Sequence, residues 1–157
     1  MKRFALSTLM LLVSGLAAAG TLEVYKSPYC GCCEKWVAHM REHGFDVNVH
    51  DTENLQAIKV RAGLQPGQGS CHTAFIDGYA IEGHVPASDV KRLLKEKPDA
   101  RGLTVPGMPA GPPGMEMGER RDAYQVLLFG AQGSRVLARH PLQPANRPVP
   151  LTPPRPC

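Results

Sequence analysis

Residues 27–35 read SPYCGCCEK and place three cysteines, Cys30, Cys32 and Cys33, within four positions. The alternation of apolar and polar residues just before this stretch predicts a strand over 21–25. From Cys33 onward, apolar residues recur every three or four positions, which predicts a helix that ends near Gly44. The cysteines therefore fall at the amino end of a helix, where unpaired backbone N–H groups and the helix dipole favour the thiolate form. Thiolates attack disulfides and bind metals.

The chain up to Pro98 continues the alternation of strand and helix patterns. Further strands are predicted over 45–49, 73–76 and 79–81, and further helices over 55–62 and around 90–94. Asp77-Gly78, a strong two-residue turn signal, joins the last two strands in a hairpin. The resulting order β-α-β-α-β-β-α predicts an α/β fold in which helices cover a small sheet.

Residues 1–19 have the pattern of a secretory signal peptide. Two basic residues precede an apolar run over 4–16, and Ala17-Ala18-Ala19 supplies small residues for cleavage. The apolar run is short for a membrane anchor, which is the alternative interpretation. Cleavage after Ala19 would lower the formal charge of +4 by two. No basic run is interleaved with aromatic residues and no later stretch is long and apolar, so we expect neither nucleic-acid binding nor a membrane span after cleavage.

All five cysteines, among them Cys71 and Cys157, follow the predicted cleavage point. Exported proteins usually pair their cysteines, but an odd number with three crowded together is a poor disulfide framework. The adjacent Cys32 and Cys33 cannot easily bridge each other. A structural disulfide from Cys30 or Cys33 to Cys71 remains an alternative to a chemically active group of thiols.

The composition changes after Pro98. Residues 103–118, LTVPGMPAGPPGMEMG, are rich in proline and glycine and are predicted to form a loop with neither helix nor central strand. Methionine usually fills protein cores, but this loop has little core to fill. Its three methionines, Met108, Met115 and Met117, are therefore candidates to face a metal. A flap that closes over bound metal is a hypothesis that follows.

The C-terminal part predicts one more hairpin and a tail. Strand patterns at 124–129 and 135–138 indicate a hairpin added at the edge of the sheet. The Pro-rich residues 141–157 are predicted to be a disordered tail that ends in a free Cys157 thiol. The main domain is therefore expected to span residues 20–140.

Two segments, VYKSPYCGCCEKW and TAFIDGYAIEGHVP, resemble the active-site segment and the third and fourth strands of glutaredoxins. This resemblance implies a thioredoxin-like fold over about 21–98. Two features depart from it: a third cysteine lies inside the C-x-x-C motif, and Ser70-Cys71-His72-Thr73 replaces the proline usual before the third strand. C-x-C-C, S-C-H-T and V-P-G-M-P together resemble the CopG-like proteins of bacterial copper resistance over about 21–118. That family is exported, thioredoxin-like and copper-binding, which implies a periplasmic location and a multinuclear copper site.

In a thioredoxin-like fold, the loop before the third strand faces the amino end of the first helix, which would bring Cys71 and His72 to the other cysteines. Thiolates and thioethers are soft ligands that select Cu(I). Zn²⁺ held by three cysteines and a histidine is the alternative. His72 would support the site rather than bind copper if the chain there is extended, and His84 is a weaker candidate near the site. The expected metal ligands are Cys30, Cys32, Cys33, Cys71, Met108, His72, Met115 and Met117.

Two functions follow from this set of residues. The first is a periplasmic copper-binding protein that sequesters, transfers or redox-converts Cu(I)/Cu(II), with copper ions and other periplasmic copper-handling proteins as its partners. The second is a thiol–disulfide oxidoreductase with Cys30 as nucleophile and Cys33 as the resolving thiol. Turnover as a copper or thiol oxidoreductase stays open at this stage.

Overall fold

The computed structural model describes residues 20–116 and 118–142. The predictions for the leader at 1–19, for Met117 and for residues 143–157, Cys157 included, lie outside the described residues. No helix in the described ranges is long and apolar enough to cross a membrane.

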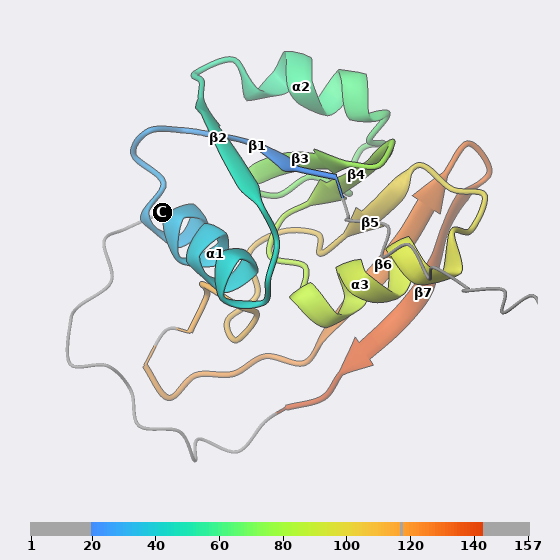
Figure 1. Cartoon of the computed structure of the whole chain (residues 1–157). Coiled ribbons are helices and arrows are strands. Elements are labelled where there is room, and N and C mark those ends of the chain that lie inside the picture. The colour runs from blue at the N-terminus through green and yellow to red at the C-terminus, as the bar shows by residue number, and fades with distance from the viewer. Residues whose placement is uncertain (1–19, 117, 143–157) are drawn as a thin grey trace, which may run out of the picture.

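The described residues form one mixed sheet and three helices (Figure 1). The elements are β1 (Leu22–Lys26), α1 (Gly31–Glu42), β2 (Val47–Asp51), α2 (Leu55–Ala62), β3 (His72–Ile76), β4 (Tyr79–Glu82), α3 (Ala87–Glu96), β5 (Gly102–Thr104), β6 (Tyr124–Gly130) and β7 (Gly133–His140). The strand order is β2-β1-β3-β4-β5-β6-β7. β1 pairs with β2, and β4 with β5, in parallel, whereas the other neighbours are antiparallel. The predicted α/β class and the added C-terminal hairpin are confirmed.

Helices cover both faces of the sheet, with α1 and α3 on one side and α2 on the other (Figure 1). The larger core lies under α1 and α3, where Trp36, Met40 and Leu93 are fully buried. A smaller cluster on the opposite face joins Ala62 of α2 to Phe129 of β6. The helical stripe predicted from the sequence therefore faces the core, as its spacing indicated.

The structure differs from the prediction at residues 103–104, which were expected to belong to a loop without a central strand. β5 lies between β4 and β6 and is buried throughout. Gly102 permits this pairing because a Cβ atom there would lie 1.7 Å from the carbonyl oxygen of Ala80 on β4. The first proline of this segment is Pro106, so residues 102–104 before it can form backbone hydrogen bonds with β4 and β6. β2 also begins and ends two residues later than the predicted strand.

A buried hydrogen bond fixes α1 to the connection between β4 and α3. The indole Nε1 of Trp36 donates to the carbonyl oxygen of Val85 at 2.8 Å. We expect Trp36→Phe to lower the free energy of unfolding by about 1–3 kcal/mol, because it leaves a buried carbonyl without its donor. Urea denaturation of the reduced, metal-free protein measures this loss. Tyr79→Phe is the matched control, since the Tyr79 hydroxyl donates to Pro98 at a half-buried position that water can reach. Equal losses in the two variants would contradict the prediction.

Candidate metal centre

Three cysteines of the centre lie at the beginning of α1. Cys30 is the N-cap residue, and Cys32 and Cys33 follow in the first turn. All three are buried. Cys30 and Cys33 form a disulfide. The disulfide therefore joins the two cysteines of the C-x-x-C spacing. The alternative disulfide from Cys30 or Cys33 to Cys71 is absent, and Cys71 is a free cysteine.

Cys71 precedes β3 and brings a fourth sulfur to the same place. The Sγ atoms of Cys30, Cys32, Cys33 and Cys71 all lie within 4.8 Å of one another. Cys30 Sγ and Cys32 Sγ are 3.5 Å apart. The pairing of β1 with β3 explains this convergence, since Lys26 at the end of β1 lies opposite His72 at the start of β3. The predicted meeting of the C-x-C-C and S-C-H-T motifs is therefore present in the fold.

A buried histidine contacts the fourth sulfur. Nε2 of His84 lies 3.0 Å from Cys71 Sγ, and Nδ1 of His84 lies 2.8 Å from the carbonyl oxygen of Pro113. A carbonyl only accepts hydrogen bonds, so Nδ1 carries the proton and the Nε2 lone pair faces the sulfur. Burial lowers the pKa of His84 to about 4 and raises the pKa of the Cys71 thiol to about 11. In the metal-free protein at neutral pH, the Cys71 thiol donates to a neutral imidazole.

His72 lies next to the same sulfur from the other side. Its Nδ1 is 3.3 Å from Cys71 Sγ, and its ring packs against Trp36 with 4.4 Å between the ring centroids. The side chain therefore approaches Cys71 although the two residues are adjacent, because Cys71 lies before the strand rather than in it. Among the described residues, Nε2 of His72 is the buried side-chain nitrogen or oxygen without a hydrogen-bond partner. Such a buried nitrogen without a partner calls for a specific explanation, and coordination of a metal ion is one.

The loop after β5 packs over the cysteines and contributes Met115. This side chain is 3% exposed and belongs to the buried cluster formed with Cys30, Cys32 and Cys33. Met108, in contrast, is 42% exposed, and its Sδ lies 3.8 Å from Ser70 Oγ. The structure thus places Met115 against the thiols and Met108 near the surface beside the Cys71 loop. The sequence predicted both methionines as ligands, and of these two Met115 is the one that packs against the cysteines.

A buried ammonium group secures the turn that carries the cysteines. Lys26, 1% exposed, lies at the end of β1, and its Nζ contacts Glu34 of α1 at 2.6 Å and Asp51 of β2 at 2.7 Å. These contacts join the first turn of α1 to the two strands beneath it. The start of α1, which carries Cys30, Cys32 and Cys33, is therefore fixed to the sheet.

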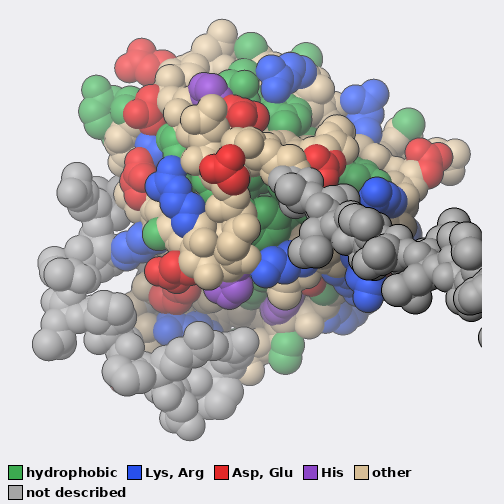
Figure 2. Space-filling view, in the orientation of Figure 1, with side chains coloured by type: hydrophobic (Ala, Val, Ile, Leu, Met, Phe, Trp, Pro, Cys, Tyr) green, Lys and Arg blue, Asp and Glu red, His purple; other side chains and the backbone are tan. Residues whose placement is uncertain are grey.

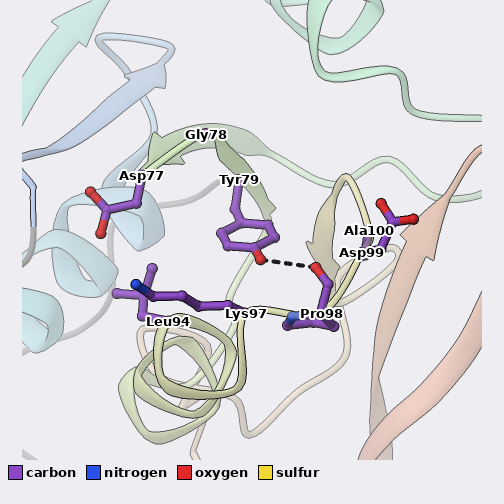
Figure 3. Close-up of a pocket in the computed structure, with 8 residues that line it drawn as sticks. All are labelled: Asp77, Gly78, Tyr79, Leu94, Lys97, Pro98, Asp99 and Ala100. Carbon is purple, nitrogen blue, oxygen red and sulfur yellow. Dashed lines mark hydrogen bonds between the residues drawn. The ribbon is translucent and has the colours of Figure 1, made fainter.

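One surface pocket lies away from the cysteines. It has a volume of about 420 Å³ and is bounded by the β3–β4 turn and the end of α3, with Asp77, Tyr79, Leu94 and Lys97 in its lining (Figure 3). This is the opposite end of β3 and β4 from Cys71 and His84. On the face seen in Figure 2, acidic and basic side chains are interspersed rather than gathered by sign. The metal centre is therefore a packed cluster of side chains and not a large cavity.

We expect the metal-free protein to lose stability in mild acid. The pKa of His84 is about 4 in the folded protein against an ordinary value of 6.5, so between these values the unfolded chain binds a proton that the folded protein does not. Stability therefore falls from about pH 6.5 to about pH 4, by up to about 3 kcal/mol, and the His84 contribution is constant above pH 6.5. Burial lowers the pKa of His72 in the same direction.

Urea unfolding of the reduced, metal-free protein between pH 7.5 and pH 4.5 measures this loss. His84→Gln, which cannot take up the proton, is expected to show a smaller loss over the same range. Equal stability at both ends of the range in the wild-type protein would refute the expectation.

Two residues of the centre carried little or no signal in the sequence. His84 was only a weak candidate, because its relation to Cys71 depends on the pairing of β3 with β4 and on Gly83 N–H bonding to the His72 carbonyl. Glu82, buried beside this group, carried no signal beyond its place at the end of a strand. The sequence signal that could have indicated Glu82 is an acidic residue at the end of a predicted hairpin strand, away from the turn and opposite a threonine.

The chain is similar to a family of known proteins and to two solved structures. Residues 68–115 match a family model described as a protein of unknown function, DUF411. A solved structure titled copper resistance protein CopG, form 2, is 45% identical, with a TM-score of 0.75, and covers 79% of this chain and 100% of its own. Form 1 of the same title is 46% identical, with a TM-score of 0.74, and covers 79% and 99%. No curated protein matched.

Proposed function

Because this chain belongs to the family of the CopG copper resistance proteins, we propose that it is an exported copper-binding protein that acts in copper resistance. Its substrate is Cu(I), bound as more than one ion by cysteine sulfurs and by side chains around them. The protein sequesters these ions, passes them to other periplasmic copper-handling proteins, or converts them between Cu(I) and Cu(II).

The convergence of four cysteine sulfurs within 4.8 Å carries this proposal. Soft thiolate sulfur selects Cu(I) over hard cations, and sulfurs at this spacing are close enough to bridge neighbouring ions. The buried thioether of Met115 adds a second soft donor. Zn²⁺ needs only four ligands in a tetrahedron, so a group of four sulfurs, two imidazoles and a thioether exceeds what one zinc ion requires.

The imidazoles of His72 and His84 add nitrogen ligands on one side of Cys71, which we call the nitrogen side of the centre; the cysteines of α1 form its sulfur side. Cys71, His72 and His84 form a second group whose ligand atoms lie within 4.8 Å of one another. Imidazole suits Cu(II) as well as Cu(I), whereas thiolate and thioether favour Cu(I). Cys71 belongs to both groups, which supports a role for the protein in handling both oxidation states. His84 joins the ligand set on this ground.

The Cys30–Cys33 disulfide determines which form of the protein binds copper. A disulfide removes two thiolates from the group, and reduction by two electrons returns them. We therefore expect the reduced chain to take up more Cu(I) than the oxidised one. The electron pair that Cys30 and Cys33 exchange is also sufficient to reduce two Cu(II) ions to Cu(I) while the disulfide forms.

Anaerobic titration of the reduced, leaderless chain with Cu(I) against a competing chelator tests the proposal. We expect tight uptake of more than one ion per chain, with an ultraviolet charge-transfer band from thiolate to copper. Weak uptake, or uptake unaffected by prior oxidation of the thiols, would overturn the assignment.

A thiol–disulfide oxidoreductase is the second candidate, and the disulfide between Cys30 and Cys33 at the start of α1 favours it. In that reaction, the reduced Cys30 thiolate attacks a substrate disulfide, and Cys33 then resolves the mixed disulfide and releases the reduced substrate. Reduction of a small disulfide substrate by the metal-free chain, with loss in Cys33→Ser, would support this activity.

A further inference from the structure

Glu82, the last residue of β4, carries a carboxylate that is 0% exposed. Glu82 lies directly opposite Thr73 in the antiparallel pairing of β3 with β4. Thr73 follows Cys71 by two residues in the chain. A buried carboxylate is costly unless it is paired and hydrogen-bonded. Its partners therefore indicate what the residue does.

Three donors from three segments meet at this carboxylate. Oε2 accepts from the Thr73 hydroxyl at 2.6 Å, and Oε1 accepts from the backbone N–H of Ser70 at 2.6 Å. Oε1 also forms an ion pair with Lys59 of α2, whose side chain is 17% exposed and whose Nζ also donates to Thr73 Oγ1 at 3.3 Å. The carboxylate is thus fully engaged, and one of its bonds goes to the residue before Cys71.

Ser70 passes this constraint to the loop after β5. Its hydroxyl donates to the Gly107 carbonyl at 2.6 Å and lies 3.8 Å from Met108 Sδ. Gly107 N–H in turn donates to the Gly69 carbonyl at 2.9 Å. The segments that carry Cys71 and Met108 are therefore fastened to each other at Ser70, and Ser70 is fastened to the sheet at Glu82.

We propose that Glu82 is a positioning residue of the copper site, which holds the Ser70 backbone so that Cys71 Sγ stays with the other sulfurs and Met108 stays beside Ser70. The inference rests on the proposed function, because it concerns the same site. Glu82 itself does not bind the metal, since its two oxygens are taken by Ser70, Thr73 and Lys59. Lys59 balances its charge.

Glu82→Gln keeps the size of the side chain but removes its charge and leaves a single, neutral acceptor oxygen for the donors of Ser70, Thr73 and Lys59. The anchor of the Cys71 loop is then weakened, whereas the anchors of Cys30, Cys32 and Cys33 on α1 are unchanged. Residues that orient metal ligands typically contribute about 10-fold to 100-fold to metal affinity. We expect a loss of this size for Cu(I), with a changed thiolate-to-copper charge-transfer spectrum.

The double variant Glu82→Gln/Lys59→Met separates positioning from general stability. It removes both charges, so no unpaired ammonium remains beside β4, and we expect urea unfolding to show a smaller loss than in Glu82→Gln alone. Copper affinity is expected to stay low in the double variant because the charged carboxylate that accepts from Ser70 N–H is still missing. Glu96→Gln, which breaks the exposed pair with Arg92, is the matched control and should bind copper like the wild type.

A second readout needs no copper. In the oxidised, metal-free protein we expect iodoacetamide to alkylate Cys71 several-fold faster in Glu82→Gln than in Glu96→Gln, measured by mass spectrometry of the Cys71 peptide. Faster alkylation together with weaker copper binding supports the inference. Unchanged alkylation and unchanged copper binding in Glu82→Gln overturn it and leave the proposed function standing. Absence of copper binding in the wild-type chain overturns the proposed function, and the positioning of a copper site with it, whatever the alkylation rates.

Discussion

Cys71→Ser is expected to reduce both the number of Cu(I) ions bound per chain and the affinity for those that remain. Cys71 Sγ lies within 4.8 Å of the three other sulfurs and also contacts His84 and His72. It is therefore the atom that connects the sulfur side of the centre to the nitrogen side. A serine hydroxyl is a hard ligand that does not replace a bridging thiolate for Cu(I). We expect the affinity to fall by about 100-fold or more, the upper part of the range for disturbed metal sites.

Cys33→Ser is the matched comparison, because it also removes one buried sulfur. It breaks the Cys30–Cys33 disulfide, so we expect it to abolish reduction of a disulfide substrate as well as to weaken copper binding. Cys71→Ser leaves that pair intact and should keep such activity. Anaerobic Cu(I) titration and a disulfide-reduction assay on both variants make the comparison. If Cys71→Ser bound copper like the wild type, the four-sulfur centre would be refuted.

Gly114→Ala is expected to lift the loop after β5 away from α1. Gly114 has a φ of +83°, and a Cβ atom there would lie 2.7 Å from the Cys32 carbonyl oxygen and 2.8 Å from the Trp36 backbone nitrogen. Both contacts are backbone atoms of α1, which cannot move aside. Overpacking and left-handed strain together predict a loss of about 3 kcal/mol in the free energy of unfolding.

The same change should weaken copper binding, because Gly114 lies between two parts of the centre. Its neighbour Pro113 accepts the hydrogen bond that orients His84, and its neighbour Met115 packs on the thiols. Gly107→Ala is the control: its φ is +70°, but a Cβ atom would meet nothing within 4 Å. We expect that variant to show only the backbone strain, about 1 kcal/mol, and less effect on copper. Urea unfolding and Cu(I) titration measure both variants, and equal effects would contradict the steric argument.

Local patterns in the sequence predicted most of the fold. The apolar stripe of α1, the Asp77-Gly78 turn and the hairpin of β6 and β7 depend on residues close in the chain, and the structure contains all three. β5 was not predicted, because its three residues become a strand only between β4 and β6. Its pairing depends on the absence of a side chain at Gly102, which no local pattern reveals.

The residues of the candidate site that belong to sequence motifs were predictable, whereas those whose position depends on tertiary packing were not. The four cysteines were expected together, and their sulfurs lie together. Which methionine faces them depends on how a glycine-rich loop settles on α1, a long-range contact made at Gly114. His84 and Glu82 flank Gly83, whose φ of +71° and N–H bond to His72 turn the chain there. Such tertiary contacts leave no periodic signal in the sequence.

The loop that covers the thiols begins at the end of β5 and returns to the start of β6, and these two strands are neighbours in the sheet. Its two attachment points are therefore fixed by the sheet whatever the sequence between them. The length and the donor atoms of such a loop can therefore change without moving the two strands that hold its ends. Grafting this segment from related chains onto the present framework is accordingly a direct route to copper sites of altered capacity.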